Sequence, residues 1–188
     1  MAEKLRFMPD QNPEEYKRFE KYADANVYHV SIEPDFSRLV VWSTDVTDTL
    51  LNLVKSMSES LFILYVLHVS RCDQETARYQ SEELRGSEVE EFLNKYADFL
   101  ANDSRHDIWF HSPSDNSTVV YDRDNIIYIY GEMDKYESIL SELQFSSYPE
   151  PLYLPCPHGH HYHSEYDEQE INILSEYNWR KSPLKEED

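Results

Sequence analysis

The chain has 188 residues, and its 40% hydrophobic and 14% aromatic residues provide enough apolar surface for a packed core. Its 17 Lys and Arg against 37 Asp and Glu give a formal net charge of −20. This excludes nucleic acids and anionic membranes as expected partners, because Lys and Arg supply most of the attraction to both. We expect a basic protein partner instead, since opposite net charges draw two proteins together.

The small numbers of glycines and cysteines exclude further classes of protein. The 3 Gly are too far apart for either glycine-rich phosphate-binding loop. Cys72 and Cys156 are too few for a disulfide framework. The first residues hold no apolar stretch of signal-peptide length, and the longest apolar run, residues 61–69, is too short to cross a membrane. We expect a cytoplasmic protein.

The first part of the chain predicts a helix, a strand pair and a second helix. Residues 1–11 are expected to form a loose lead-in, and Asn12 is a candidate cap for a short helix. Residues 27–32 and 38–43 are predicted strands joined by a turn. Apolar residues at helical spacing in 46–58 predict one buried helix face.

The next elements are a buried strand and a long helix. Residues 61–69 are apolar on both faces, which predicts a strand inside the sheet that is covered on both sides. Residues 76–80 are a candidate edge strand. The strongest helical stripe follows in residues 87–102, and Ser87 with Glu90 forms a predicted capping box at its start.

Residues 107–130 are the predicted centre of the sheet. Three short apolar and aromatic runs are separated by two polar turns, which indicates an antiparallel meander. Gly131 ends the third strand, and a helix is expected over 132–143. Residues 146–165 form a Pro- and His-rich segment that we expect to be extended, because proline removes backbone donors and disfavours helix.

The chain ends in a short helix from about Asp167 and a polar tail over residues 181–188. Taken together, the pattern predicts a single domain over residues 1–188 with an α+β (or α/β) fold. We expect one mixed or mainly antiparallel sheet, with helices packed chiefly on one face. The sequence carries no signal for a particular oligomeric state.

A histidine-rich tract holds the candidate metal ligands. Imidazole and thiolate are common zinc ligands, so zinc is a possible cofactor, and no other cofactor is implied. The competing interpretation is a surface histidine loop that binds metal only opportunistically, or that orders itself by packing and hydrogen bonds, because one short loop does not easily aim four rings at one point. The candidate ligands are Cys156, His158, His160, His161 and His163.

Acidic residues interleaved with tyrosines form the candidate partner-binding set. Aromatic rings supply rigid contact area, and carboxylates pair with Lys and Arg of a partner. The competing interpretation is a set of solvated surface residues. The candidates are Asp122, Asp124, Glu132, Asp134, Glu137, Tyr162, Glu165, Tyr166 and Asp167.

No catalytic residue is assigned. His111, Ser112 and Asp115 have the residue types of nucleophilic catalysis, but the chain lacks a GxSxG nucleophile elbow. Formation of a turn accounts for these residues more simply.

The leading hypothesis is an acidic, non-enzymatic protein that covers and neutralises a basic protein partner. Its most concrete form is an immunity protein against a bacterial nuclease toxin, because a nuclease holds phosphates with basic residues. One alternative is a metal-dependent zinc enzyme that uses the loop from His158 to His163. Another is a structural or adaptor domain.

Overall fold

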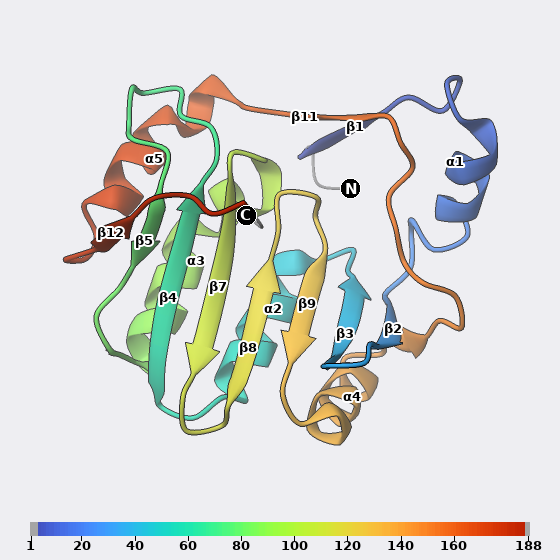
Figure 1. Ribbon diagram of the computed structural model, residues 1–188, viewed down its shortest axis with the longest axis horizontal. Coiled ribbons are helices and arrows are strands. Elements are labelled where there is room, and N and C mark those ends of the chain that lie inside the picture. The colour runs from blue at the N-terminus through green and yellow to red at the C-terminus, as the bar shows by residue number, and fades with distance from the viewer. Residues whose placement is uncertain (1–3, 187–188) are drawn as a thin grey trace.

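The computed structural model describes residues 4–186 (Figure 1). The strands are β1 (Leu5–Phe7), β2 (Val27–Ile32), β3 (Ser37–Trp42), β4 (Ser60–Leu67), β5 (Arg78–Gln80), β6 (Leu84–Arg85), β7 (His106–Ser112), β8 (Ser117–Tyr121), β9 (Ile127–Tyr130), β10 (Ser146–Ser147), β11 (His158–His160) and β12 (Arg180–Ser182). The helices are α1 (Pro13–Phe19), α2 (Val46–Lys55), α3 (Gly86–Asn102), α4 (Met133–Glu142) and α5 (Asp167–Leu174), with a short 3-10 helix η1 (Ser164–Tyr166).

A ten-stranded sheet forms the body of the protein. Its strand order is β10-β2-β3-β9-β8-β7-β4-β5-β12, and β6 pairs with β4 outside this path. β10 lies parallel to β2, whereas the other pairs of the sheet are antiparallel. The predicted α+β fold with a mixed, mainly antiparallel sheet is therefore confirmed. The predicted meander is confirmed as β7-β8-β9 at the centre of the sheet.

Helices α2, α3 and α4 pack on one face of the sheet and lie behind it in Figure 1. The predicted stripe of α2 is buried there, including Leu50 and Leu53. Asp45 caps α2 by accepting a hydrogen bond from the backbone N–H of Asp48 at 3.1 Å. The cap of α3 differs from the prediction, because the Glu88 carboxylate accepts the backbone N–H of Arg85 at 2.9 Å.

The opposite face of the sheet is covered at its β2–β3 end. There α1 and residues 152–154 form a second, smaller core. Phe19 packs edge-on against Trp42, with ring centroids 5.0 Å apart. The Trp42 indole donates to the Ala23 carbonyl at 3.0 Å, and the Tyr22 hydroxyl donates to the Tyr153 carbonyl. These contacts fix α1 to the sheet.

The rest of that face is only partly covered by residues 4–186, since Val66 and Val120 on it are buried but other residues are not, which corrects the prediction that residues 61–69 are covered on both sides. In β4 the helix-facing Ile63 and Tyr65 are buried, but Phe62 and Leu64 on the other face are partly exposed. The helices that follow β3, β6 and β9 all return on the same side of the sheet. An apolar pattern on both faces of a strand therefore did not require a second covering layer.

The N-terminal segment differs from the loose lead-in expected over residues 1–11. Leu5–Phe7 form β1, which pairs antiparallel with β11, and the side chain of Lys4 is fully buried. The Lys4 ammonium donates to the Asp122 carbonyl at 2.8 Å and lies 3.8 Å from the centre of the Tyr121 ring. These contacts order a segment whose composition predicts little structure. Residues 1–3 lie outside the described residues.

The C-terminal part of the chain is mostly extended, as its prolines suggest. Between residues 146 and 163 the only regular elements described are the short strands β10 and β11. The expected polar tail begins with β12, which pairs antiparallel with β5 at the sheet edge. Residues 187–188 lie outside the described part. No helix within residues 4–186 combines the length and hydropathy needed to cross a bilayer.

Candidate functional site

The turn between β8 and β9 holds Asp124 in a fixed position. One carboxylate oxygen of Asp122 accepts the backbone N–H groups of Asp124 at 2.9 Å and Ile126 at 2.8 Å. Asn125 has a φ of 64°, a left-handed conformation that Asn tolerates well. The turn is therefore tightly constrained, and Asp124 projects from a rigid base.

β11 brings two histidines to the same turn. Its antiparallel pairing with β1 sets His158 opposite Phe7 and His160 opposite Leu5. Residues two apart in a strand share a face, so both rings point the same way. The backbone N–H of His161 donates to the Lys4 carbonyl at 2.9 Å and extends the anchoring by one residue.

Asp124, His158 and His160 meet there, and we call these three residues the Asp–His cluster. Oδ1 of Asp124 lies 2.7 Å from Nε2 of His160 and 3.3 Å from Nε2 of His158. The side chains of His158, His160 and Asp124 are 13%, 18% and 39% exposed. Burial disfavours ionisation of Asp124, but its hydrogen bonds with His160 and His158 outweigh that effect and lower its pKa. Asp124 is therefore a carboxylate facing two imidazoles.

The other ring nitrogens have different neighbours. Nδ1 of His158 lies 3.1 Å from the Pro155 carbonyl oxygen, which can only accept a hydrogen bond. Nδ1 of His160 lies 3.0 Å from a guanidinium nitrogen of Arg123, which can only donate one. The two histidines of the cluster thus sit in opposite hydrogen-bonding environments.

The Asp–His cluster lines one end of a pocket of about 680 Å³ on the open face of the sheet. Asp107 in this pocket accepts the backbone N–H of Arg123 at 2.7 Å, and its other carboxylate oxygen lies 2.9 Å from Nε2 of His68. Burial raises the pKa of Asp122 at the same end. We call this space the open-face pocket, and its lining residues are Arg38, Asp107, Trp109, Val120, Asp122, Arg123, Asp124, Tyr128, Tyr130, His158 and His160.

The other predicted metal ligands lie apart from the cluster. Sγ of Cys156 is 3.9 Å from Nδ1 of His158, on the side of that ring away from Asp124. The rings of His161 and His163 pack edge-on against each other with centroids 5.5 Å apart. The structure therefore groups His158 and His160 with Asp124, a residue that the sequence suggested only for partner binding.

Arg105 anchors the segment that follows the histidines, and sequence patterns did not reveal this role. Its fully buried guanidinium forms two hydrogen bonds with the Asp103 carboxylate, at 2.8 and 2.9 Å, and also pairs with Glu170. It donates to the His163 carbonyl at 2.9 Å and contacts Asp167 at 3.2 Å. Buried ions need such partners, so the end of α3, the histidine tract and α5 are tied together.

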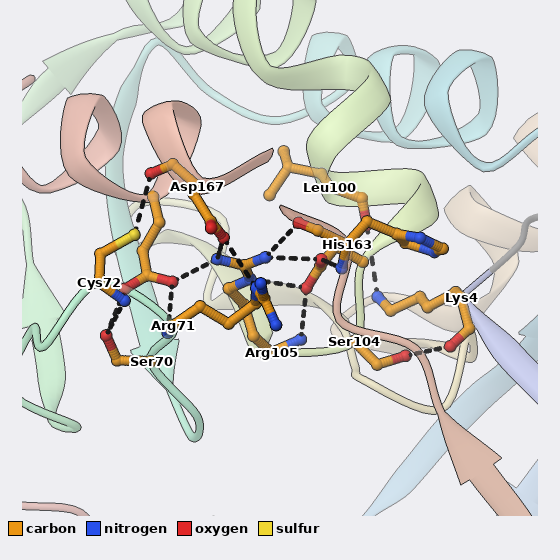
Figure 2. Close-up of polar contacts among 11 residues, drawn as sticks. Lys4, Ser70, Arg71, Cys72, Leu100, Ser104, Arg105, His163 and Asp167 are labelled. Carbon is orange, nitrogen blue, oxygen red and sulfur yellow. Dashed lines mark hydrogen bonds and ion pairs between the residues drawn. The ribbon is translucent and has the colours of Figure 1, made fainter. Parts of the chain in front are cut away.

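The neighbouring Cys72 belongs to the same network. Its backbone N–H donates to the Ser70 hydroxyl at 3.1 Å, and its thiol contacts the Asp167 carbonyl at 3.4 Å (Figure 2). Burial is the largest cause of a raised pKa for this thiol. A raised pKa keeps the thiol protonated, which disfavours a nucleophilic role.

The predicted partner-binding residues lie in three separate places. Asp122 and Asp124 occupy the β8–β9 turn, whereas the acidic residues at the start of α4 lie at the other end of β9 (Figure 1). The third group begins with Tyr162 inside the histidine tract and continues into α5, where Asp167 also pairs with Arg71 at 2.9 Å. The residues outside the turn are Glu132, Asp134, Glu137, Tyr162, Glu165, Tyr166 and Asp167.

The residues considered for nucleophilic catalysis bond to other side chains. The Asp115 carboxylate accepts the backbone N–H of Ser58 at 2.7 Å and also pairs with the Ser58 hydroxyl. Nδ1 of His111 lies 3.0 Å from the Thr118 hydroxyl on the next strand. Asp115 thus joins the β7–β8 turn to the end of α2.

Comparison with known proteins identified no matching protein-family model, no matching curated protein and no matching solved structure.

Proposed function

We propose that this chain is an acidic, non-enzymatic binding protein that covers and neutralises a basic protein partner in the cytoplasm. Its most concrete form is an immunity protein against a bacterial nuclease toxin. The observation that carries the proposal is the net charge of −20 on 188 residues. A field of that sign accelerates encounter with a cationic surface, and a nuclease needs such a surface to hold phosphates.

The open face of the sheet is the surface that we propose for contact. The strand register aligns Leu64, Trp109, Val120 and Tyr128 in one row across four neighbouring strands. Leu64, Trp109 and Tyr128 are partly exposed. Large rigid aromatic rings of this kind often dominate binding energy at protein interfaces.

Charged groups beside this row supply the complementarity. Asp107 and Asp124 line the same pocket as Trp109 and Tyr128. The carboxylates suit Lys and Arg side chains of a partner. Arg38 and Arg78 of this chain already lie over the rings of Tyr128 and Trp109, 4.7 and 5.7 Å from the ring centroids, so a partner's cations would reach the acids rather than the faces of these rings. The proposed occupant is therefore a basic protein segment.

The test uses the full chain and the basic protein encoded beside its gene. Association and nuclease activity are measured at about 50 mM and about 500 mM NaCl, where screening differs strongly. We expect inhibition of the nuclease and an association rate that falls at the higher salt concentration. Absence of inhibition at both concentrations would overturn the proposal.

A pair of variants locates the contact surface. Trp109→Ala removes an aromatic ring from the open face and should weaken binding by about 10-fold or more, the usual effect of an interface hot spot. Ile32→Ala is the matched control, because Ile32 is 79% exposed and lies at the end of β2 on the helix-facing side, away from the open face. Circular dichroism would verify that both variants fold. Equal binding by both would move the partner away from the open face.

A further inference from the structure

We infer that the Asp–His cluster binds one divalent transition-metal ion, with Zn²⁺ as the ion to test. Asp124, His158 and His160 each offer one ligand atom, and these atoms lie within 4.8 Å of one another. Two imidazoles and one carboxylate form a common zinc ligand set. The inference does not rest on the proposed function, although both use Asp124: a metal ion held there would take the carboxylate that a basic partner would otherwise contact.

The separations within the cluster suit a shared ion. With metal–ligand distances of about 2.1 Å, two ligand atoms of a tetrahedral zinc site lie about 3.4 Å apart. The distance of 3.3 Å between Asp124 and His158 is close to that value, and the distance of 2.7 Å to His160 requires only a small outward shift. The cluster also lines the open-face pocket, so water or a ligand can reach an ion held there.

The hydrogen-bonding environment of the His158 ring is compatible with a bound metal ion. Both of its nitrogens face acceptors, namely the Pro155 carbonyl and the Asp124 carboxylate. A neutral imidazole has only one N–H, so it cannot satisfy both neighbours, whereas an imidazolium or a metal-bound ring can. Donation from Nδ1 to Pro155 leaves the lone pair of Nε2 directed at the carboxylate, an arrangement that a cation between them would stabilise. A backbone carbonyl on the other nitrogen is also the usual support of a metal-bound histidine.

The ligands come from two elements that are each held by their own hydrogen bonds. Asp124 belongs to the hydrogen-bonded β8–β9 turn, and the histidines belong to β11, which is held by β1. Such support keeps side chains in place before a metal arrives. This distinguishes the cluster from a flexible histidine tract that collects metal at any of its rings.

Arg123 opposes metal binding and provides a sharp test. Its guanidinium donates to Nδ1 of His160, which places the proton of a neutral ring on Nε2. Coordination through Nε2 moves that proton to Nδ1, so Arg123 must then turn away. Removing the guanidinium should therefore strengthen metal binding, whereas it should not affect an ion held by His161 or His163.

The experiment measures Zn²⁺ binding to the tag-free full chain by equilibrium dialysis and calorimetry. We expect one Zn²⁺ per chain. Asp124→Asn should weaken binding by about 100-fold or more, because even groups that only support metal ligands affect affinity about 10- to 100-fold. Arg123→Met should tighten it by about 10-fold. The double variant His161→Ala/His163→Ala is the control and should bind like the wild type.

Three outcomes would overturn the assignment. The first is no Zn²⁺ binding by the wild type. The second is binding that survives Asp124→Asn but is lost in the double variant, which would place the ion at His161 and His163. The third is unchanged affinity in Arg123→Met, which contradicts coordination through Nε2 of His160. Thermal unfolding of each metal-free variant would separate loss of a ligand from loss of the fold.

Discussion

Arg105 is a fully buried cation that links three segments far apart in the sequence. Its partners are Asp103 at the end of α3, the backbone of His163, and Glu170 in α5. Burial opposes its charge, but hydrogen bonds with Asp103 and Glu170 outweigh this and raise its pKa. Asp103 and Glu170 are also fully buried, and Arg105 is the cation that both carboxylates contact.

Replacement of Arg105 should therefore be severe. We expect Arg105→Met to lower the free energy of unfolding by about 3–5 kcal/mol, because it leaves two buried carboxylates without their cation. Urea denaturation provides the measurement. Arg85→Met is the matched control, since the Arg85 side chain is 77% exposed and its pair with Glu88 should contribute little. A similar effect of both variants would contradict the role of burial.

A double variant tests the same point from the other side. Adding Glu170→Gln to Arg105→Met removes one of the two carboxylate charges that the loss of Arg105 leaves without a cation. The double variant should then be less destabilised than the sum of the two single variants, because the residues belong to one network. Simple additivity would show that Arg105 does not act through Glu170.

At the level of single residues, periodicity could not predict these contacts. Asp124 is 34 residues from His158, and Arg105 is 65 residues from Glu170. The composition of the histidine tract did indicate metal ligands, but it could not separate His158 and His160 from their neighbours. The pairing of β11 with β1 distinguishes His158 and His160 from the other histidines of the tract. β1 lies in a segment that was expected to be a loose lead-in.

Secondary structure was predicted more successfully, because local patterns determine it. The stripes of α2 and α3 and the alternation in β7, β8 and β9 follow directly from one buried face. The pattern of β4 was less informative. Its outer residues are apolar although residues 4–186 place no helix over them. The sequence of a strand indicates how hydrophobic each of its faces is, but it does not indicate which element covers that face.

The junction between β9 and α4 depends on the one glycine with a positive φ among the described residues. Gly131 has a φ of 144°, and a Cβ there would lie 2.9 Å from Cβ of Ser117 and 3.2 Å from the ring of Tyr136. We expect Gly131→Ala to lower the free energy of unfolding by about 1–3 kcal/mol through backbone strain and overlap.

Gly159→Ala is the control for that substitution. Gly159 lies in β11, where the nearest atom to an added Cβ is 3.9 Å away. This change should leave stability unchanged or raise it slightly, since alanine restricts the unfolded chain. Equal loss of stability in both variants on urea denaturation would show that space and φ do not explain the difference.

Across the whole molecule, a net charge of −20 sets two responses to salt that have opposite signs. Self-repulsion is stronger in the compact state than in the expanded unfolded chain, so screening should stabilise the fold. Screening should instead slow association with a basic partner. If the net charge only adapted the protein to a salty environment, salt would change the stability of the fold without changing association with a partner.

We therefore expect the urea midpoint to rise between about 10 mM and about 500 mM NaCl, as the screening length falls from about 30 Å to below about 10 Å. The triple variant Glu91→Gln/Glu142→Gln/Glu168→Gln removes charge at three exposed positions and should respond less to salt. An identical salt response in wild type and variant would mean that salt acts by another route than screening. If the variant also associates more slowly with the partner at low salt, the same charges oppose folding and favour binding, which relates the composition of the chain to its proposed function.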